Sequence, residues 1–193
     1  MRITRWSRTD QLFLEGVLWT VPAIALLHVL VDLVRALRGD PLQASGAVPD
    51  ALVRSAELIT GPLSGTVVVD DPTTAQYAWD LLPGLVVLVL AAVAARLLLG
   101  VVRTLRLGDP FTVANARRLT ALAALVVVGG LLLPVLQGIS HASVVEPLVA
   151  SDGSSTWVLE IELWPASVGV LIAFLAEVFS RGARLREDVE GLV

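Results

Sequence analysis

The first candidates for chemistry are three ionisable residues inside an apolar stretch: His28, Asp32 and Arg35. Their spacing of four and then three positions places all three on one face of a helix. Ionisable residues in a membrane span are functional hypotheses by default, so the cluster could relay an ion or bind a substrate. The alternative is a hydrogen-bonded cluster at the membrane boundary, in which His28 pairs with Asp32.

The same residues offer too few ligands for a metal ion. Zinc needs three or four protein ligands, and the chain has two histidines and no cysteine. The second histidine, His141, is expected near the outer end of a different span. We therefore expect no metal site.

Arg96 is the other charged residue deep in an apolar stretch. It lies six residues from the inner end of its expected span, a depth of about 9 Å at helical rise. We predict that it pairs inside a helix bundle, with Glu177 as the first partner and Glu15 as the second. The alternative is that its long side chain snorkels to the membrane surface.

No other pattern in the chain indicates catalysis. The sequence has no nucleotide-binding loop, no zinc-protease motif and no serine nucleophile elbow. We expect that the protein is not an enzyme and needs no cofactor.

The elements that position these residues are predicted by composition. The chain is 55% hydrophobic and 17% charged, where soluble domains carry about 25% charged residues. Four stretches approach the roughly 20 apolar residues of a membrane span: residues 12–34, 81–102, 119–139 and 163–179. The first is too long for the apolar core of a signal peptide. We predict an all-α membrane protein of four transmembrane helices in two hairpins, forming one integral membrane domain over residues 1–193.

Arginine placement predicts the orientation. Arginines gather before the first span, between the second and third, and after the fourth, whereas the other two connections are acidic. Because positive charge marks the cytoplasmic side, both termini are predicted inside. Residues 103–118 then form a cytoplasmic connector and 180–193 a cytoplasmic tail, with outer segments at 35–80 and 140–162.

The outer segments contain two β-branched stretches, Gly65–Asp71 and Ser155–Trp164. The second also alternates apolar and acidic residues, a pattern typical of a strand. We predict that the two pair in a small extracytoplasmic sheet, and the alternative is that both are loops.

The connector contains the stretch GDPFTVANARRL, residues 108–119, which has helix-breaking residues at its start. The second helix should stop at Gly108, and Pro110 favours a turn. Thr112 is placed to cap a new helix by reaching the N–H of Asn115.

Two adjacent arginines, Arg117 and Arg118, follow on that helix and are expected at the lipid headgroups. The connector is then either a topology anchor or a docking surface. In the tail, we predict that a helix folds back so that Leu185 and Val189 cover Phe111, and the alternative is a disordered, solvated end.

Two motifs resemble those of a bacterial family of four-helix inner-membrane proteins known as a domain of unknown function. The first, G-x-P-F-T-x-x-N-A-x-R-L, is matched by Gly108, Pro110, Phe111, Thr112, Asn115, Ala116, Arg118 and Leu119. The second, A-E-V-F-x-x-G-x-x-L-R-E, is matched by Ala176, Glu177, Val178, Phe179, Gly182, Leu185, Arg186 and Glu187. The resemblance implies a multi-pass protein of the bacterial cytoplasmic membrane without established chemistry. Family genes often neighbour one for a Cro-like DNA-binding protein, which implies a cytosolic regulatory partner.

The expected function is therefore protein–protein contact in signalling or regulation, within the lipid bilayer and without direct nucleic-acid binding. The alternative is a subunit of a transporter or an ion-conducting oligomer, and a homo-oligomer is compatible with either. The expected interaction or structural residues are Gly108, Pro110, Phe111, Thr112, Asn115, Arg117, Arg118, Glu177, Arg181, Gly182, Leu185 and Arg186.

Overall fold

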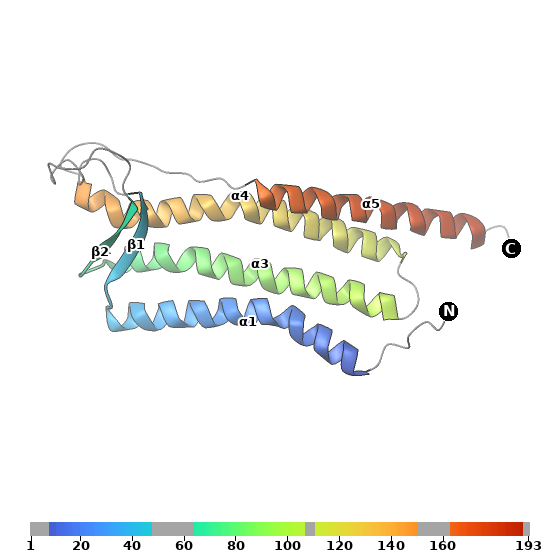
Figure 1. Cartoon of the computed structure of the whole chain (residues 1–193), viewed down its shortest axis with the longest axis horizontal. Helices are drawn as coiled ribbons and strands as arrows, with labels where there is room; N and C mark the ends of the chain where they lie inside the picture. Colours follow the sequence, from blue (N-terminus) through green and yellow to red (C-terminus); the bar gives the residue numbers. More distant parts are fainter. Residues whose placement is uncertain (1–7, 48–63, 107–110, 150–162, 191–193) are drawn as a thin grey trace. The chain divides into compact units, whose positions relative to one another are not determined.

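A computed structural model describes residues 8–47, 64–106, 111–149 and 163–190. In chain order the elements are α1 (Arg8–Arg38), β1 (Leu42–Ala47), β2 (Ser64–Val69), α3 (Thr74–Arg106), α4 (Val113–Val149) and α5 (Trp164–Glu190) (Figure 1). All four helices are long and apolar enough to cross a membrane. The predicted all-α membrane fold with four spanning helices and a small β element is confirmed.

The helices extend well beyond the apolar stretches. The start of α3 lies at Thr74 because Thr73 and Gln76 form a reciprocal cap. The N–H of Gln76 donates to Thr73 Oγ1 at 3.3 Å, and the N–H of Thr73 donates to Gln76 Oε1 at 2.7 Å. This capping box satisfies two amide groups that would otherwise lack a partner at the helix start. The segments predicted as outer connections, 35–80 and 140–162, are therefore partly helical.

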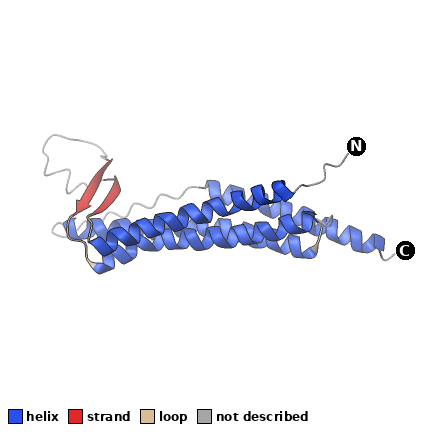
Figure 2. Ribbon diagram, turned by 90° about the horizontal axis from the view of Figure 1, so that it is seen from below, coloured by secondary structure: helices blue, strands red, loops and turns tan. Residues whose placement is uncertain are grey.

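The β element is a two-stranded antiparallel sheet, drawn in red in Figure 2. Its register runs from Leu42 opposite Val69 to Ala47 opposite Ser64. The strand predicted at Gly65–Asp71 is confirmed in its first five residues, and the structure pairs it with β1, a strand that the sequence did not predict. The predicted pairing with Ser155–Trp164 stays a prediction. Of the predicted partner strand, residues 155–162 lie outside the described residues.

The chain divides into two compact units, which we describe in turn. The sheet-bearing unit comprises residues 27–86 and 132–161. Here Leu42 of β1 is buried with Val144 and Val145 of α4, and Val69 and Tyr77 pack against this cluster. The apolar contacts thus fix β1 on α4.

The other unit comprises residues 1–26, 87–131 and 162–193. Its core joins three helices, since Val101 of α3, Leu119 of α4 and Ala176 of α5 are buried together. Helices α4 and α5 approach closely at Gly130, where an added Cβ would lie 2.5 Å from the Cβ of Pro165. Glycine is required at this position because a side chain would displace α5.

Candidate functional site

The connector residues build a polar network at the facing ends of α3 and α4. Helix α4 begins at Val113, and the N–H of Asn115 donates to Thr112 Oγ1 at 3.2 Å, so the predicted cap is confirmed. The Asn115 side chain is completely buried. Its Nδ2 donates to Thr104 Oγ1 on α3 at 2.5 Å. A buried amide needs such partners, because an unsatisfied polar group costs about 1–3 kcal/mol.

Arg118 completes this network. One guanidinium nitrogen, Nη1, donates to Asn115 Oδ1 and to the backbone oxygen of Gly100, both at 2.9 Å. An added Cβ at Gly100 would lie 2.7 Å from Arg118 Nε, so a side chain at this position would displace the guanidinium from its hydrogen bonds. Arg118 therefore links α4 to α3, a role that the sequence analysis did not assign. Gly100 and Thr104 accept these hydrogen bonds. The sequence did not point to them, because they lie on α3, whereas the motif residues Asn115 and Arg118 lie on α4.

An aromatic contact connects the same region to α5. The rings of Phe111 and Phe179 lie 5.2 Å apart between centroids, tilted by 43°. A Cβ on Gly182 would lie 2.6 Å from Phe111 Cδ1, so the missing side chain makes room for the ring. We call Gly100, Thr104, Phe111, Asn115, Arg118, Phe179 and Gly182 the junction cluster.

The predicted fold-back of the tail is wrong. Helix α5 continues without interruption to Glu190, and Leu185 is 67% exposed instead of covering Phe111. The physical reason is that residues 183–190 contain neither glycine nor proline, so nothing breaks the helix. The side chains of Val189 and Arg186 lie outside the described residues, as do Gly108 and Pro110.

The predicted pair between Arg96 and Glu177 is also wrong. Glu177 pairs with Arg181 on its own helix, with 2.7 Å between Oε1 and Nε, and both side chains are exposed. Arg96 is exposed on α3, and its pairing with the second candidate, Glu15, stays a prediction, as does the snorkelling alternative. An exposed i,i+4 pair contributes only about 0.3–0.5 kcal/mol.

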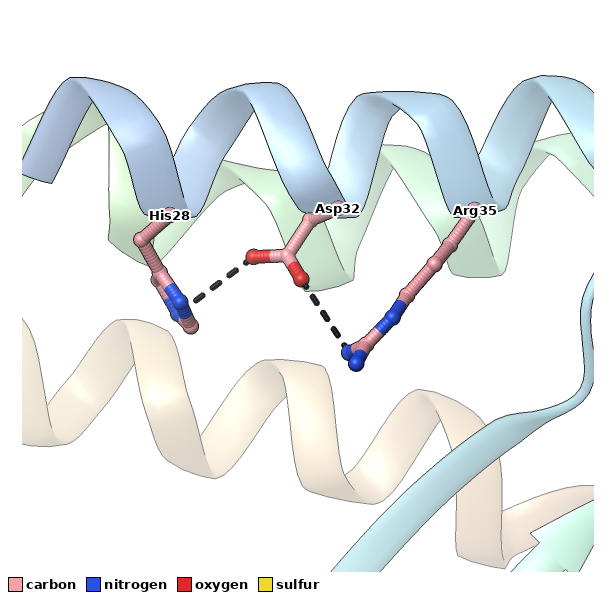
Figure 3. A network of polar contacts seen from close by, with 3 residues as sticks. All are labelled: His28, Asp32 and Arg35. Carbon is pink, nitrogen blue, oxygen red and sulfur yellow. Dashed lines mark ion pairs between the residues drawn. The ribbon is translucent and has the colours of Figure 1, made fainter.

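In the sheet-bearing unit, the predicted cluster on α1 forms (Figure 3). His28 Nε2 lies 3.3 Å from Asp32 Oδ2, and Arg35 Nη1 lies 3.5 Å from Asp32 Oδ1. The Asp32 side chain is only 15% exposed, whereas His28 and Arg35 are mostly exposed. The carboxylate is thus held between two nitrogen groups on one face of the helix.

Asp32 also lines a pocket of about 330 Å³ between α1, α3 and the sheet. The lining residues are Asp32, Arg35, Asp40, Pro41, Leu42, Gln43, Val68, Tyr77 and Asp80. The hydroxyl of Tyr77 donates to the backbone oxygen of Asp40 at 2.6 Å and so closes one side. Three carboxylates and one guanidinium line the pocket, so the formal net charge of its lining is negative when all four groups are ionised.

Asp40 and Asp80 were not singled out from sequence, because only the folded chain brings them to Asp32. Within the described ranges, no group of three or more histidine or acidic side chains is arranged to hold a metal ion. Asp32, Asp40 and Asp80 give the pocket lining its carboxylates, and Arg35 is its one guanidinium.

Comparison with known proteins gives one match. A family model described as "Protein of unknown function (DUF2975)" matches residues 68–193. The match includes α3, α4, α5 and every member of the junction cluster, and it excludes α1 and β1. No curated protein and no solved structure matches the chain significantly.

Proposed function

We propose that this chain, which belongs to the DUF2975 family of proteins of unknown function, acts by protein–protein contact in signalling or regulation. It is a small multi-pass membrane protein, and four long apolar helices support that statement. The contact surface that we propose is the C-terminal end of α5, and the proposed partner is a cytosolic regulatory protein.

The observation that carries the proposal is the exposed end of α5. The helix has 27 residues, or about 40 Å at 1.5 Å per residue, against a hydrocarbon core of about 30 Å. About 10 Å of helix therefore extends past the hydrocarbon. Leu185 lies near this end with Arg181 and Arg184, and all three are exposed. An apolar side chain flanked by fixed charges offers a partner both contact area and orientation.

The junction cluster supports the proposal by fixing this end of the helix. Phe111 packs on Phe179 and Gly182, which lie within two helical turns before Leu185. In the same unit, Asn115 and Arg118 of α4 donate hydrogen bonds to Thr104 and Gly100 of α3 and so join the two helices next to the connector. A partner would therefore meet a prearranged surface, which lowers the entropy cost of binding.

The proposal requires a cytoplasmic C-terminus, in the membrane of a bacterial cell. Ser45→Cys and Gly191→Cys test this orientation. The chain has no native cysteine, so a thiol reagent can label it only at the introduced position. We expect an impermeant thiol reagent to label position 45 on intact cells and position 191 only after permeabilisation. Labelling of position 191 on intact cells would contradict the orientation and, with it, the cytosolic partner.

Site-specific photocrosslinking tests the contact itself. A photoreactive amino acid at position 185 should give one discrete protein adduct in living cells, identified by mass spectrometry. The matched control is position 171, also an exposed leucine of α5 but within the apolar part of the helix. The adduct should vanish with Arg184→Glu. Equal adducts from both positions, or none from position 185, would refute this surface.

A second candidate is transport or ion conduction, favoured by the negatively charged pocket of the sheet-bearing unit. Purified protein in liposomes should then carry a proton or cation flux that Asp80→Asn abolishes. The matched control is Asp70→Asn, an exposed carboxylate that does not line the pocket. Flux equal to that of empty liposomes would leave the contact function as the better proposal.

A further inference from the structure

A groove between α4 and α5 takes no part in the junction cluster. It has a volume of about 340 Å³ and lies in the unit that holds the junction cluster. Part of its lining consists of small apolar side chains, Ala116, Ala173 and Ala176. Two opposite charges, Arg117 and Glu177, line the same groove.

The charges are available to a ligand. Arg117 is exposed and forms no ion pair within the part of the chain that the structure describes. Glu177 pairs with Arg181 through Oε1 but is 58% exposed, and a carboxylate has about four acceptor positions. The groove can therefore satisfy one anionic and one cationic group of a ligand at the same time.

The position of the groove selects the class of ligand. Arginines near helix ends mark the level of the lipid headgroups, and Arg117, Arg181 and Arg184 all lie at this end of α4 and α5. A molecule at this level that joins an anion, a cation and apolar chains is a zwitterionic phospholipid. The alanine surface suits its glycerol and upper acyl carbons, and guanidinium–phosphate pairs are strong because they are charge-assisted.

We propose that the α4–α5 groove binds a phospholipid whose headgroup carries a primary ammonium, of the phosphatidylethanolamine type. The phosphate pairs with Arg117, and the ammonium N–H groups donate to the Glu177 carboxylate. A choline headgroup has no N–H donor and cannot make the second contact. A purely anionic headgroup places its charge near Glu177 without compensation. The site does not depend on the proposed protein partner.

The test is lipid binding to the purified full-length protein in mild detergent, measured by native mass spectrometry and by thermal melting. Ethanolamine and choline phospholipids with identical acyl chains are compared. We expect the ethanolamine lipid to bind more tightly by about tenfold, the effect of one charge-assisted hydrogen bond. Glu177→Gln should remove this preference, and Arg117→Gln should weaken binding of both lipids.

The control is Arg103→Gln, which removes an exposed arginine of α3 outside the groove and should leave lipid binding unchanged. All three side chains are exposed, so each variant should melt like the unmodified protein in the absence of lipid. Equal binding of the two lipids, or equal effects of Arg117→Gln and Arg103→Gln, would overturn the proposal. So would equal protection by soluble phosphoethanolamine, which indicates a free phosphate site, or a dimer that Arg117→Gln dissociates, which indicates a second copy in the groove.

Discussion

Asn115→Ala is the sharpest test of the junction cluster. The substitution removes an amide that is completely buried and that joins Thr104 on α3 to Arg118 on α4. The cap from Thr112 is retained because it uses the backbone N–H of residue 115. The change in stability therefore reports on the side-chain hydrogen bonds of Asn115 and not on the cap of α4.

The size of the effect follows from the bonds that are lost. The neutral bond to Thr104 contributes about 1 kcal/mol and the bond from the charged Arg118 about 2 kcal/mol. Alanine returns up to about 0.7 kcal/mol through its higher helix propensity. A net loss of about 2 kcal/mol remains, which is roughly a 30-fold change in the unfolding equilibrium constant.

The assay is reversible unfolding in mixed micelles, followed by circular dichroism. The control is Thr120→Ala, because that exposed hydroxyl donates only to Ala116 of its own helix at 3.0 Å. We expect the control to change stability by less than about 0.5 kcal/mol. A double-mutant cycle of Asn115→Ala with Thr104→Val should show coupling, since the two side chains share a bond. A single-variant effect no larger than that of the control, or strictly additive effects in the cycle, would refute the network.

Two further substitutions test the packing and the α1 cluster. Gly182→Ala should destabilise the protein by up to about 2 kcal/mol in the same titration, because its Cβ would lie 2.6 Å from Phe111 Cδ1. Overpacking of this kind costs about 1–3 kcal/mol, and the higher helix propensity of alanine offsets about 1 kcal/mol. Gly16→Ala is the matched control, since nothing lies within 4 Å of its added Cβ, and it should be neutral or stabilising. Asp32→Asn should cost at most about 1 kcal/mol, and less at high salt, because His28 and Arg35 are mostly exposed. A salt-independent loss of several kcal/mol would instead indicate a buried charge network.

The features predicted correctly from the sequence, the four helices and the cap of α4, depend on the residues within one short segment. Hydropathy located all four helices, and Thr112 predicted the start of α4 at Val113. The helix lengths were underestimated because the prediction followed the apolar residues alone. The capping residues Thr73 and Gln76 are readable in the sequence as a threonine followed three positions later by glutamine, and they place the start of α3 correctly.

Contacts between distant segments were not predictable in the same way. The strand β1 has the sequence LQASGA, whose small residues have low β-propensity, so only its pairing with the valines of β2 makes it a strand. The pairing of Arg96 with Glu177 was inferred from depth alone, and depth does not determine which face of a helix a residue occupies. The closer partner of Glu177 was Arg181, one turn away on the same helix.

The two adjacent arginines of the connector illustrate why helix geometry has to be considered together with depth. Successive residues on an α-helix are rotated by about 100°, so Arg117 and Arg118 cannot face the same neighbour. Arg118 turns to Gly100 of α3, whereas Arg117 lines the groove with α5. Arg118→Gln should therefore lower the stability of the protein in detergent, because it removes two hydrogen bonds between or within helices. Arg117→Gln should leave stability unchanged and weaken lipid binding, so each variant is the control for the other. Equal losses of stability from both variants would show that the two guanidinium groups act only as a common positive charge at the membrane surface.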